Sequence, residues 1–145
     1  MKEDGVFRRE RVIRFSDCDP AGIVFYPQYF VMFNGLVEDW FDDGLQIGYE
    51  RLVAQRRIGL PTVRLEADFR GVSRFGDKVK LALAVERVGE RSLTLRLQCL
   101  GAEGDLRMQM RQVLVTTSLA SHQTIAIPSD LREALHGAPQ ATTTP

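Results

Sequence analysis

Two carboxylates, Asp17 and Asp19, lie beside an apolar aromatic run in the segment FSDCDPAGIVFYPQYF, which spans residues 15–30. Carboxylates in such a place are either solvated turn residues or groups that perform chemistry. The tripeptide Pro20-Ala21-Gly22 is ordinary turn sequence and favours the first interpretation. The apolar residues that follow would exclude water and keep a carboxylate reactive, which favours the second.

The start of the next helix decides what that chemistry could be. Pro27 suits the first turn of a helix, because its missing N–H is not needed there. We expect unsatisfied N–H groups at the entry, on Phe25, Tyr26 and Gln28, pointing toward the loop. Such donors stabilise a developing oxyanion, typically by about 3 kcal/mol each. A loop carboxylate could attack a carbonyl held there or activate water against it, and Gly22 would let the backbone approach the ligand closely.

Other chemistries lack the residues that they need. Cys18 has no histidine close to it in the sequence, so we interpret it as a small packed residue rather than a nucleophile. His122 and His136 lie in polar surroundings near the C-terminus and are expected to be solvated. The Asp17-x-Asp19 pair lacks the further oxygen ligands of a calcium loop, and no phosphate-binding or dinucleotide motif is present, so we predict no metal.

Composition limits the class of protein. The 145 residues suit one compact domain, which we place at residues 1–137, with a disordered tail at 138–145. The formal net charge is zero, which predicts neither a nucleic-acid nor a membrane partner. The sequence shows no signal peptide and no run that approaches a membrane span of about 18 residues. Two distant cysteines indicate a reduced, cytoplasmic setting.

Hydrophobic periodicity predicts an α+β protein. A first strand at 6–15 precedes a helix from Pro27 to about Gly44, whose stripe comprises Phe30, Phe33, Val37, Trp40 and Phe41. A shorter helical piece at 48–57 precedes four alternating strands, near 63–70, 79–86, 93–98 and 107–118, which we expect to form a meander. A brief helix follows at 129–135. One helix covers only part of such a sheet, so the remaining edge and face predict pairing with another subunit.

The opening segment resembles the active-site segment of the 4-hydroxybenzoyl-CoA thioesterase family of hotdog-fold acyl-CoA hydrolases. The family pattern D-x-D-x-x-G-x-V-x-x-x-x-Y is matched by Asp17, Asp19, Gly22, Val24 and Tyr29. The longer string DCDPAGIV-aromatic-YP is similar to the aryl-CoA branch, whereas hydrolases of short acyl-CoAs usually carry a histidine where this chain has Pro27. The resemblance extends over residues 8–128.

The resemblance implies a hotdog fold, in which a five-stranded antiparallel sheet wraps around one long central helix. It implies a homodimer or homotetramer with active sites at the subunit interface. The substrate is an acyl-CoA, so coenzyme A is part of the substrate and no separate cofactor is implied. By position, Asp19 is the catalytic nucleophile or general base, the backbone N–H near Tyr26 polarises the thioester carbonyl, and Asp17 holds the loop.

The same resemblance assigns a substrate site. Its residues are Gly22, Phe25, Tyr29, Phe33, Asn34 and Arg91. Arg91 matches a basic turn that meets the nucleotide, with Arg70, Arg74 and Lys78 as other candidates for the phosphates. Asn34 occupies the position where a 4-hydroxybenzoyl-specific enzyme carries an acidic group. The resemblance therefore does not determine which substituents the aromatic ring of the substrate carries. Alternatives are a thioesterase for short or branched aliphatic acyl-CoAs and a non-catalytic acyl-CoA-binding module.

Overall fold

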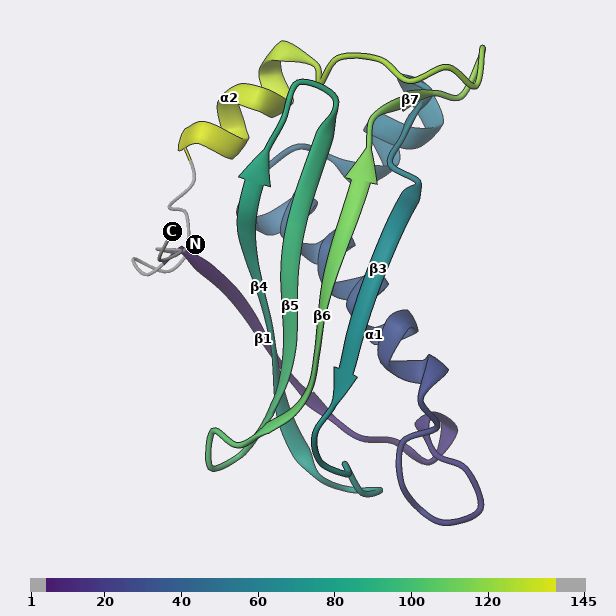
Figure 1. The fold of residues 1–145 in the computed structure, drawn as a ribbon, viewed down its shortest axis with the longest axis vertical. Coiled ribbons are helices and arrows are strands. Elements are labelled where there is room, and N and C mark those ends of the chain that lie inside the picture. Colours follow the sequence, from purple (N-terminus) through teal and green to yellow (C-terminus); the bar gives the residue numbers. More distant parts are fainter. Residues whose placement is uncertain (1–4, 138–145) are drawn as a thin grey trace.

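The computed structural model describes residues 5–137 and consists of one five-stranded antiparallel sheet with a long helix on one face (Figure 1). The sheet contains β1 (Val6–Val12), β3 (Thr62–Phe69), β4 (Lys78–Val88), β5 (Ser92–Gly101) and β6 (Leu106–Val115). A second, two-stranded sheet joins β2 (Ile58–Gly59) to β7 (Thr117–Ser118). This arrangement confirms the predicted fold class. The expected tail at 138–145 lies outside the described residues.

The long helix forms where the apolar stripe predicted it. Helix α1 runs over Pro27–Asp39 and continues as one π-helical turn, Trp40–Gly44. The helix ends at Gly44, where a Cβ atom would lie 2.7 Å from the Trp40 ring. Its buried side chains pack on the inner-face leucines of β4 and β5 and form the core with them. The shorter elements are a 3-10 turn at Phe15–Asp17, a π turn at Arg51–Gln55 and helix α2 at Ser129–Gly137.

The strand order differs from the predicted meander. The order is β1-β4-β5-β6-β3, so only β4, β5 and β6 follow one another as neighbours. Strand β3 crosses to the far edge and pairs antiparallel with β6, with Phe69 opposite Met108 and Leu65 opposite Gln112. The chain reaches that edge because α1 and the turns after it carry it across the sheet before β3 begins (Figure 1).

Strand β3 also differs from its predicted half-burial. All of its residues except Ala67 are exposed, including Val63, Leu65 and Phe69. By register, Leu65 and Phe69 share the inner face with buried residues of β6, yet α1 does not cover them. The strand therefore presents an open edge and uncovered apolar side chains.

Candidate active site

The Asp19 loop is a small hairpin that its own backbone holds together. The Asp19 N–H donates to the Ile23 carbonyl at 3.0 Å, and the Gly22 N–H donates to the Asp19 carbonyl at 2.9 Å. Gly22 has a φ of 78°, which glycine adopts without strain. The Ala21 N–H donates to Asp19 Oδ1 at 2.9 Å, as in an Asx turn. The Asp19 carboxylate is thus half-exposed at the tip of an ordered turn.

Asp17 occupies a different environment. Its side chain is buried and accepts two hydrogen bonds from Arg11 Nη2, at 2.9 and 3.1 Å. The Arg14 N–H donates a third at 2.8 Å. These contacts fix the start of the loop, so Asp17 has a positioning role and Asp19 is the carboxylate that a ligand can reach.

One backbone donor at the entry to α1 is free. The Phe25 N–H donates to the Asp17 carbonyl at 2.9 Å, and the Gln28 N–H donates to the Phe25 carbonyl at 2.8 Å. These two of the three expected donors are therefore taken. The Tyr26 N–H has no hydrogen-bond partner among the described residues, and it lies at the N-terminal end of the helix. Of the three expected backbone donors, it is therefore the one that remains available to an oxyanion within residues 5–137.

The segment 71–77 supports this loop from the side. The Val24 N–H donates to the Ser73 carbonyl at 2.9 Å, and the Phe75 N–H donates to the Gly22 carbonyl at 3.0 Å. Ser73 is buried, and its hydroxyl accepts a hydrogen bond from the Tyr29 hydroxyl at 3.0 Å. The helix, the supporting segment and the Asp19 loop are therefore connected by direct hydrogen bonds.

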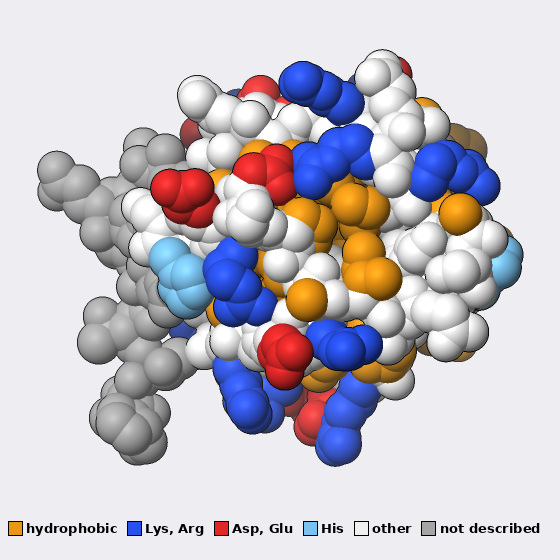
Figure 2. All heavy atoms as spheres, turned by 90° about the horizontal axis from the view of Figure 1, so that it is seen from above, with side chains coloured by type: hydrophobic (Ala, Val, Ile, Leu, Met, Phe, Trp, Pro, Cys, Tyr) orange, Lys and Arg blue, Asp and Glu red, His pale blue; other side chains and the backbone are white. Residues whose placement is uncertain are grey.

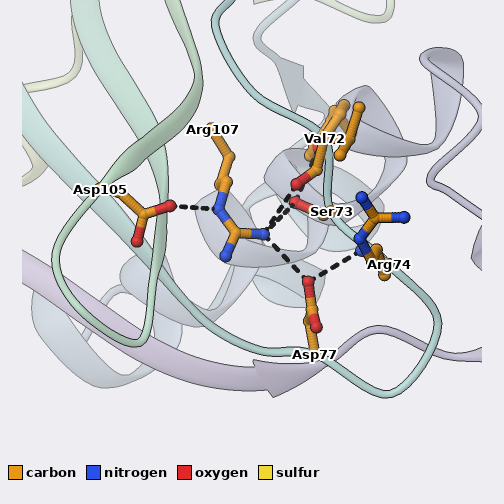
Figure 3. A network of polar contacts seen from close by, with 7 residues as sticks. Val72, Ser73, Arg74, Asp77, Asp105 and Arg107 are labelled. Carbon is orange, nitrogen blue, oxygen red and sulfur yellow. Dashed lines mark hydrogen bonds and ion pairs between the residues drawn. The ribbon is translucent and has the colours of Figure 1, made fainter.

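Arg107 on β6 anchors the supporting segment (Figure 3). Its Nη1 donates to the Val72 carbonyl at 2.9 Å and to Asp77 Oδ2 at 3.0 Å, while its Nε donates to Asp105 at 2.6 Å. Hydrogen bonds from the Arg74 backbone and from the Arg107 guanidinium lower the pKa of Asp77. The sequence reasoning did not identify this network, because its members come from two stretches, 72–77 and 105–107, that lie about 30 residues apart in the sequence. The arginine at position 107, within a strand of alternating apolar residues, was the one visible signal.

Exposed aromatic rings surround the entry to α1. The ring of Tyr26 is in contact with those of Phe25 and Phe69, at centroid distances of 5.6 and 6.0 Å. Phe15 and Phe75 form another pair at 5.7 Å. All five rings are exposed, Tyr26 at 58%. An apolar surface of this kind marks a place where a ligand or another chain binds.

The other predicted substrate residues lie at three different places. Tyr29 and Phe33 are buried in the core of their own chain. Asn34 is exposed and lines a hollow of about 440 Å³ between α1 and the start of β3. Arg91 lies beyond the other end of β4, where it donates to the Thr124 carbonyl at 3.1 Å. The structure therefore does not bring Arg91 to Asp19 within one chain.

The Asp19 loop and Arg91 lie near opposite ends of β4. This strand has 11 residues, which is about 35 Å of extended chain. Figure 2 views the Arg91 end, where α2 and the β4–β5 turn lie, and shows Lys and Arg side chains around an apolar area. On the Asp19 side, Arg74 forms a β-bridge with Ile23, and Arg70 and Lys78 flank the supporting segment. These three cations are nearer the loop than Arg91 is.

The surroundings of Cys18 do not activate its thiol. Burial raises the pKa of the Cys18 thiol, and the carboxylates of Asp17 and Asp19 raise it further, which opposes a nucleophilic thiolate. Within residues 5–137, no three His, Cys, Asp or Glu side chains converge as metal ligands would. In the same range, no helix has the length and apolar character needed to cross a bilayer.

The sequence and the fold are similar to those of known thioesterases. The family model described as "Thioesterase-like superfamily" matches residues 13–135. The 4-hydroxybenzoyl-CoA thioesterase of Pseudomonas sp. (strain CBS-3) is 26% identical over 128 residues, which cover 83% of this chain and 91% of that protein. The solved structure of a 1,4-dihydroxy-2-naphthoyl-CoA thioesterase from Synechocystis has a TM-score of 0.83 at 21% identity, over 92% of this chain and 97% of that chain. A gentisyl-coenzyme A thioesterase structure has a TM-score of 0.78 at 23% identity, over 89% of this chain and 99% of that chain.

Proposed function

The chain belongs to the thioesterase-like superfamily, and we propose that it hydrolyses the thioester of an aromatic acyl-CoA to the free acid and coenzyme A. The observation that carries the proposal is the free Tyr26 N–H at the start of α1, beside the loop that presents Asp19. The substrate class is supported by the relatives, which are named for 4-hydroxybenzoyl-CoA, 1,4-dihydroxy-2-naphthoyl-CoA and gentisyl-coenzyme A.

In the proposed reaction the thioester carbonyl accepts a hydrogen bond from the Tyr26 N–H. The positive end of the helix dipole strengthens this contact as the carbonyl oxygen gains charge, and one such donor is typically worth about 3 kcal/mol. An Asp19 oxygen then attacks the carbonyl carbon and the C–S bond breaks, giving an anhydride and the coenzyme A thiolate, which takes up a proton. Water hydrolyses the anhydride to the free acid and restores Asp19.

Asp19 as a general base is the other route. There the carboxylate removes a proton from water as the water oxygen attacks the same carbonyl carbon. Oxygen-18 found in Asp19 after a single turnover in labelled water establishes attack by Asp19, because the general-base route places all of the label in the free acid. Both routes use the same two groups, Asp19 and the Tyr26 N–H.

We also propose that a second copy of the chain completes the site. Strand β3 has an open edge and uncovered apolar side chains, and one of them, Phe69, is in contact with Tyr26. A copy that pairs along β3 would cover the exposed rings around the Asp19 loop. Arg70, Arg74 and Lys78 are the proposed partners of the coenzyme A phosphates, and Arg91 joins them only if the second copy places it there.

Thiol release from a panel of benzoyl-type and aliphatic acyl-CoAs tests the proposal. We expect the wild type to turn over the aromatic esters fastest. Faster turnover of short or branched aliphatic esters would contradict the aromatic substrate class and assign the aliphatic one instead. Tight binding of acyl-CoA without thiol release from any ester would make the chain a binding module instead.

A further inference from the structure

Gln112 is a polar residue at a core position. It lies on the inner face of β6, opposite Leu65 of β3 on one side and Leu95 of β5 on the other. The residues that alternate with it on that face, Met108, Met110 and Leu114, are apolar and buried. Gln112 itself is only 4% exposed. A glutamine in such a position needs hydrogen-bond partners for both ends of its amide.

Only one end of the Gln112 amide is satisfied. Its Nε2 donates to the Thr62 hydroxyl at 2.8 Å. Its Oε1 is buried and has no hydrogen-bond partner within the described residues. A buried carbonyl without a donor destabilises a protein, typically by about 1–3 kcal/mol. Its retention at this position points to a partner that binds here.

The hollow beside Gln112 has the composition of a ligand pocket. Its volume is about 440 Å³, within the roughly 300–1,000 Å³ of small-molecule sites. Its apolar lining includes Val37, Leu60 and Leu114, whereas its polar lining includes Asn34, Glu38 and Tyr49 beside Gln112. Burial and the nearby Glu38 charge raise the pKa of Tyr49, so this hydroxyl stays protonated at neutral pH.

The hollow lies at a suitable distance from the proposed oxyanion donor. Asn34 follows Tyr26 by eight residues, which is about 12 Å along a helix. This span accommodates one substituted aromatic ring with a hydrogen bond at each end. The uncovered inner face of β3 reaches both places, since Phe69 contacts Tyr26 and Leu65 lies opposite Gln112, and both side chains offer apolar contact to the ring.

We propose that Gln112 is a specificity-determining residue of the acyl site, whose side-chain carbonyl accepts a hydrogen bond from a hydroxyl or amino group at the end of the acyl group remote from the thioester. The inference rests on the proposed function, because the hollow is taken as the acyl pocket of the thioesterase site. It adds a feature of the substrate, namely a distal hydrogen-bond donor.

Competing substrates of nearly equal shape test this inference. The 3- and 4-hydroxybenzoyl-CoA and aminobenzoyl-CoA esters are compared with the methylbenzoyl-CoA esters, since a methyl group occupies similar space and cannot donate. We expect wild-type kcat/KM to favour at least one donor-bearing isomer by about tenfold or more. A ratio near one for every isomer in the wild type would overturn the inference without any variant.

Two substitutions of the same kind then locate the effect. Gln112→Met removes the acceptor and keeps a similar side-chain volume. It should bring the ratio of kcat/KM for the donor-bearing ester to kcat/KM for the methyl ester close to one. Gln98→Met makes the same change on the opposite face of the sheet, where Gln98 donates to Gln109, and should keep the preference. An unchanged preference in a folded Gln112→Met protein contradicts the assignment.

Binding of the free acids separates this inference from the proposed function. If the wild type hydrolyses no aromatic acyl-CoA, the proposed function fails, and NMR titration with hydroxybenzoates and methylbenzoates decides the role of Gln112. Tighter binding of the hydroxybenzoates that Gln112→Met abolishes supports a donor-selective pocket. Equal binding of both acids, or no binding of either, rejects it.

Discussion

The backbone carbonyl of Asp17 accepts a hydrogen bond from the Phe25 N–H at 2.9 Å, and this contact ties together the two ends of the Asp19 loop. It occupies the Phe25 N–H, as the Phe25 carbonyl occupies the Gln28 N–H, whereas the Tyr26 N–H is free among the described residues. The two aspartates of the motif consequently differ in role: Asp17 shapes the loop, and Asp19 is presented at its tip.

Asp17→Asn should destabilise the fold. Asparagine keeps the shape but leaves Arg11, which is only about one-third exposed, without a charged partner. We expect a loss of about 2 kcal/mol in the free energy of unfolding, measured in urea, because the Asp17 carboxylate is buried and accepts two hydrogen bonds from Arg11 Nη2. Asp19→Asn, whose half-exposed side chain accepts a hydrogen bond from the Ala21 N–H, serves as the matched control and should change stability little. Equal stability of wild type and Asp17→Asn would contradict the positioning role.

The Arg107 network should make the free energy of unfolding depend on pH in the acid range. The pKa of Asp77 is lowered in the folded state from its ordinary value of 3.8, so its charge stabilises the fold above that pH. That contribution is lost as the pH falls through the folded pKa. In Arg107→Gln the unfolding free energy should fall at pH 7, typically by about 2 kcal/mol, and the gap to wild type should narrow near pH 3.

The control for this series is Arg64→Gln, which breaks an ion pair with Glu66 on β3. Because both side chains of that pair are more than half exposed, we expect the variant to lose no more than about 1 kcal/mol. Hydrogen bonding from Arg107 also lowers the pKa of Asp105, so a gap between wild type and Arg107→Gln that is constant from pH 7 to pH 3 would show that neither Asp77 nor Asp105 is the group concerned.

Oligomeric state is the next prediction. Light scattering should show at least a dimer of the 16.4 kDa chain, with the homotetramer as the larger predicted form. Val63 on β3 is 60% exposed, and Val63→Asp should weaken the assembly and reduce thiol release together, because charge at the open edge opposes strand pairing. Val12→Asp makes the same change on β1, at the other edge of the sheet, and should leave the assembly intact. A monomeric, fully active wild type would refute the shared site.

The sequence predicted the bounds of the helices and strands better than it predicted which strands pair with each other. The alternation of β3 and the stripe of α1 are local patterns, and both elements are present within a few residues of the predicted bounds. No local pattern specifies that β3 pairs with β6 rather than with β4, since that choice depends on where α1 returns the chain to the sheet. The first strand ends at Val12 rather than residue 15, because a 3-10 turn positions Asp17 there.

The site was predictable in part. The spacing of the motif identified the Asp19 loop and the helix entry, which are adjacent in sequence. Tyr29 and Phe33 were assigned to the substrate, but in this chain the helix stripe buries both of them in the core. Gln112 was not predicted, although the sequence contains a signal for it. In the strand RMQMRQVLV it occupies a position at which the alternating pattern predicts a buried apolar residue.

The central claim is that Asp19 performs the chemistry while Asp17 holds the loop. Its most direct test is the rate of thiol release by Asp19→Asn on the best aromatic acyl-CoA, beside wild type and with folding checked by circular dichroism. We predict a fall of about a thousandfold with unchanged unfolding stability, on the scale of losing a nucleophile or a general base. Turnover within a few-fold of wild type in the folded variant would contradict the claim and move the catalytic group elsewhere.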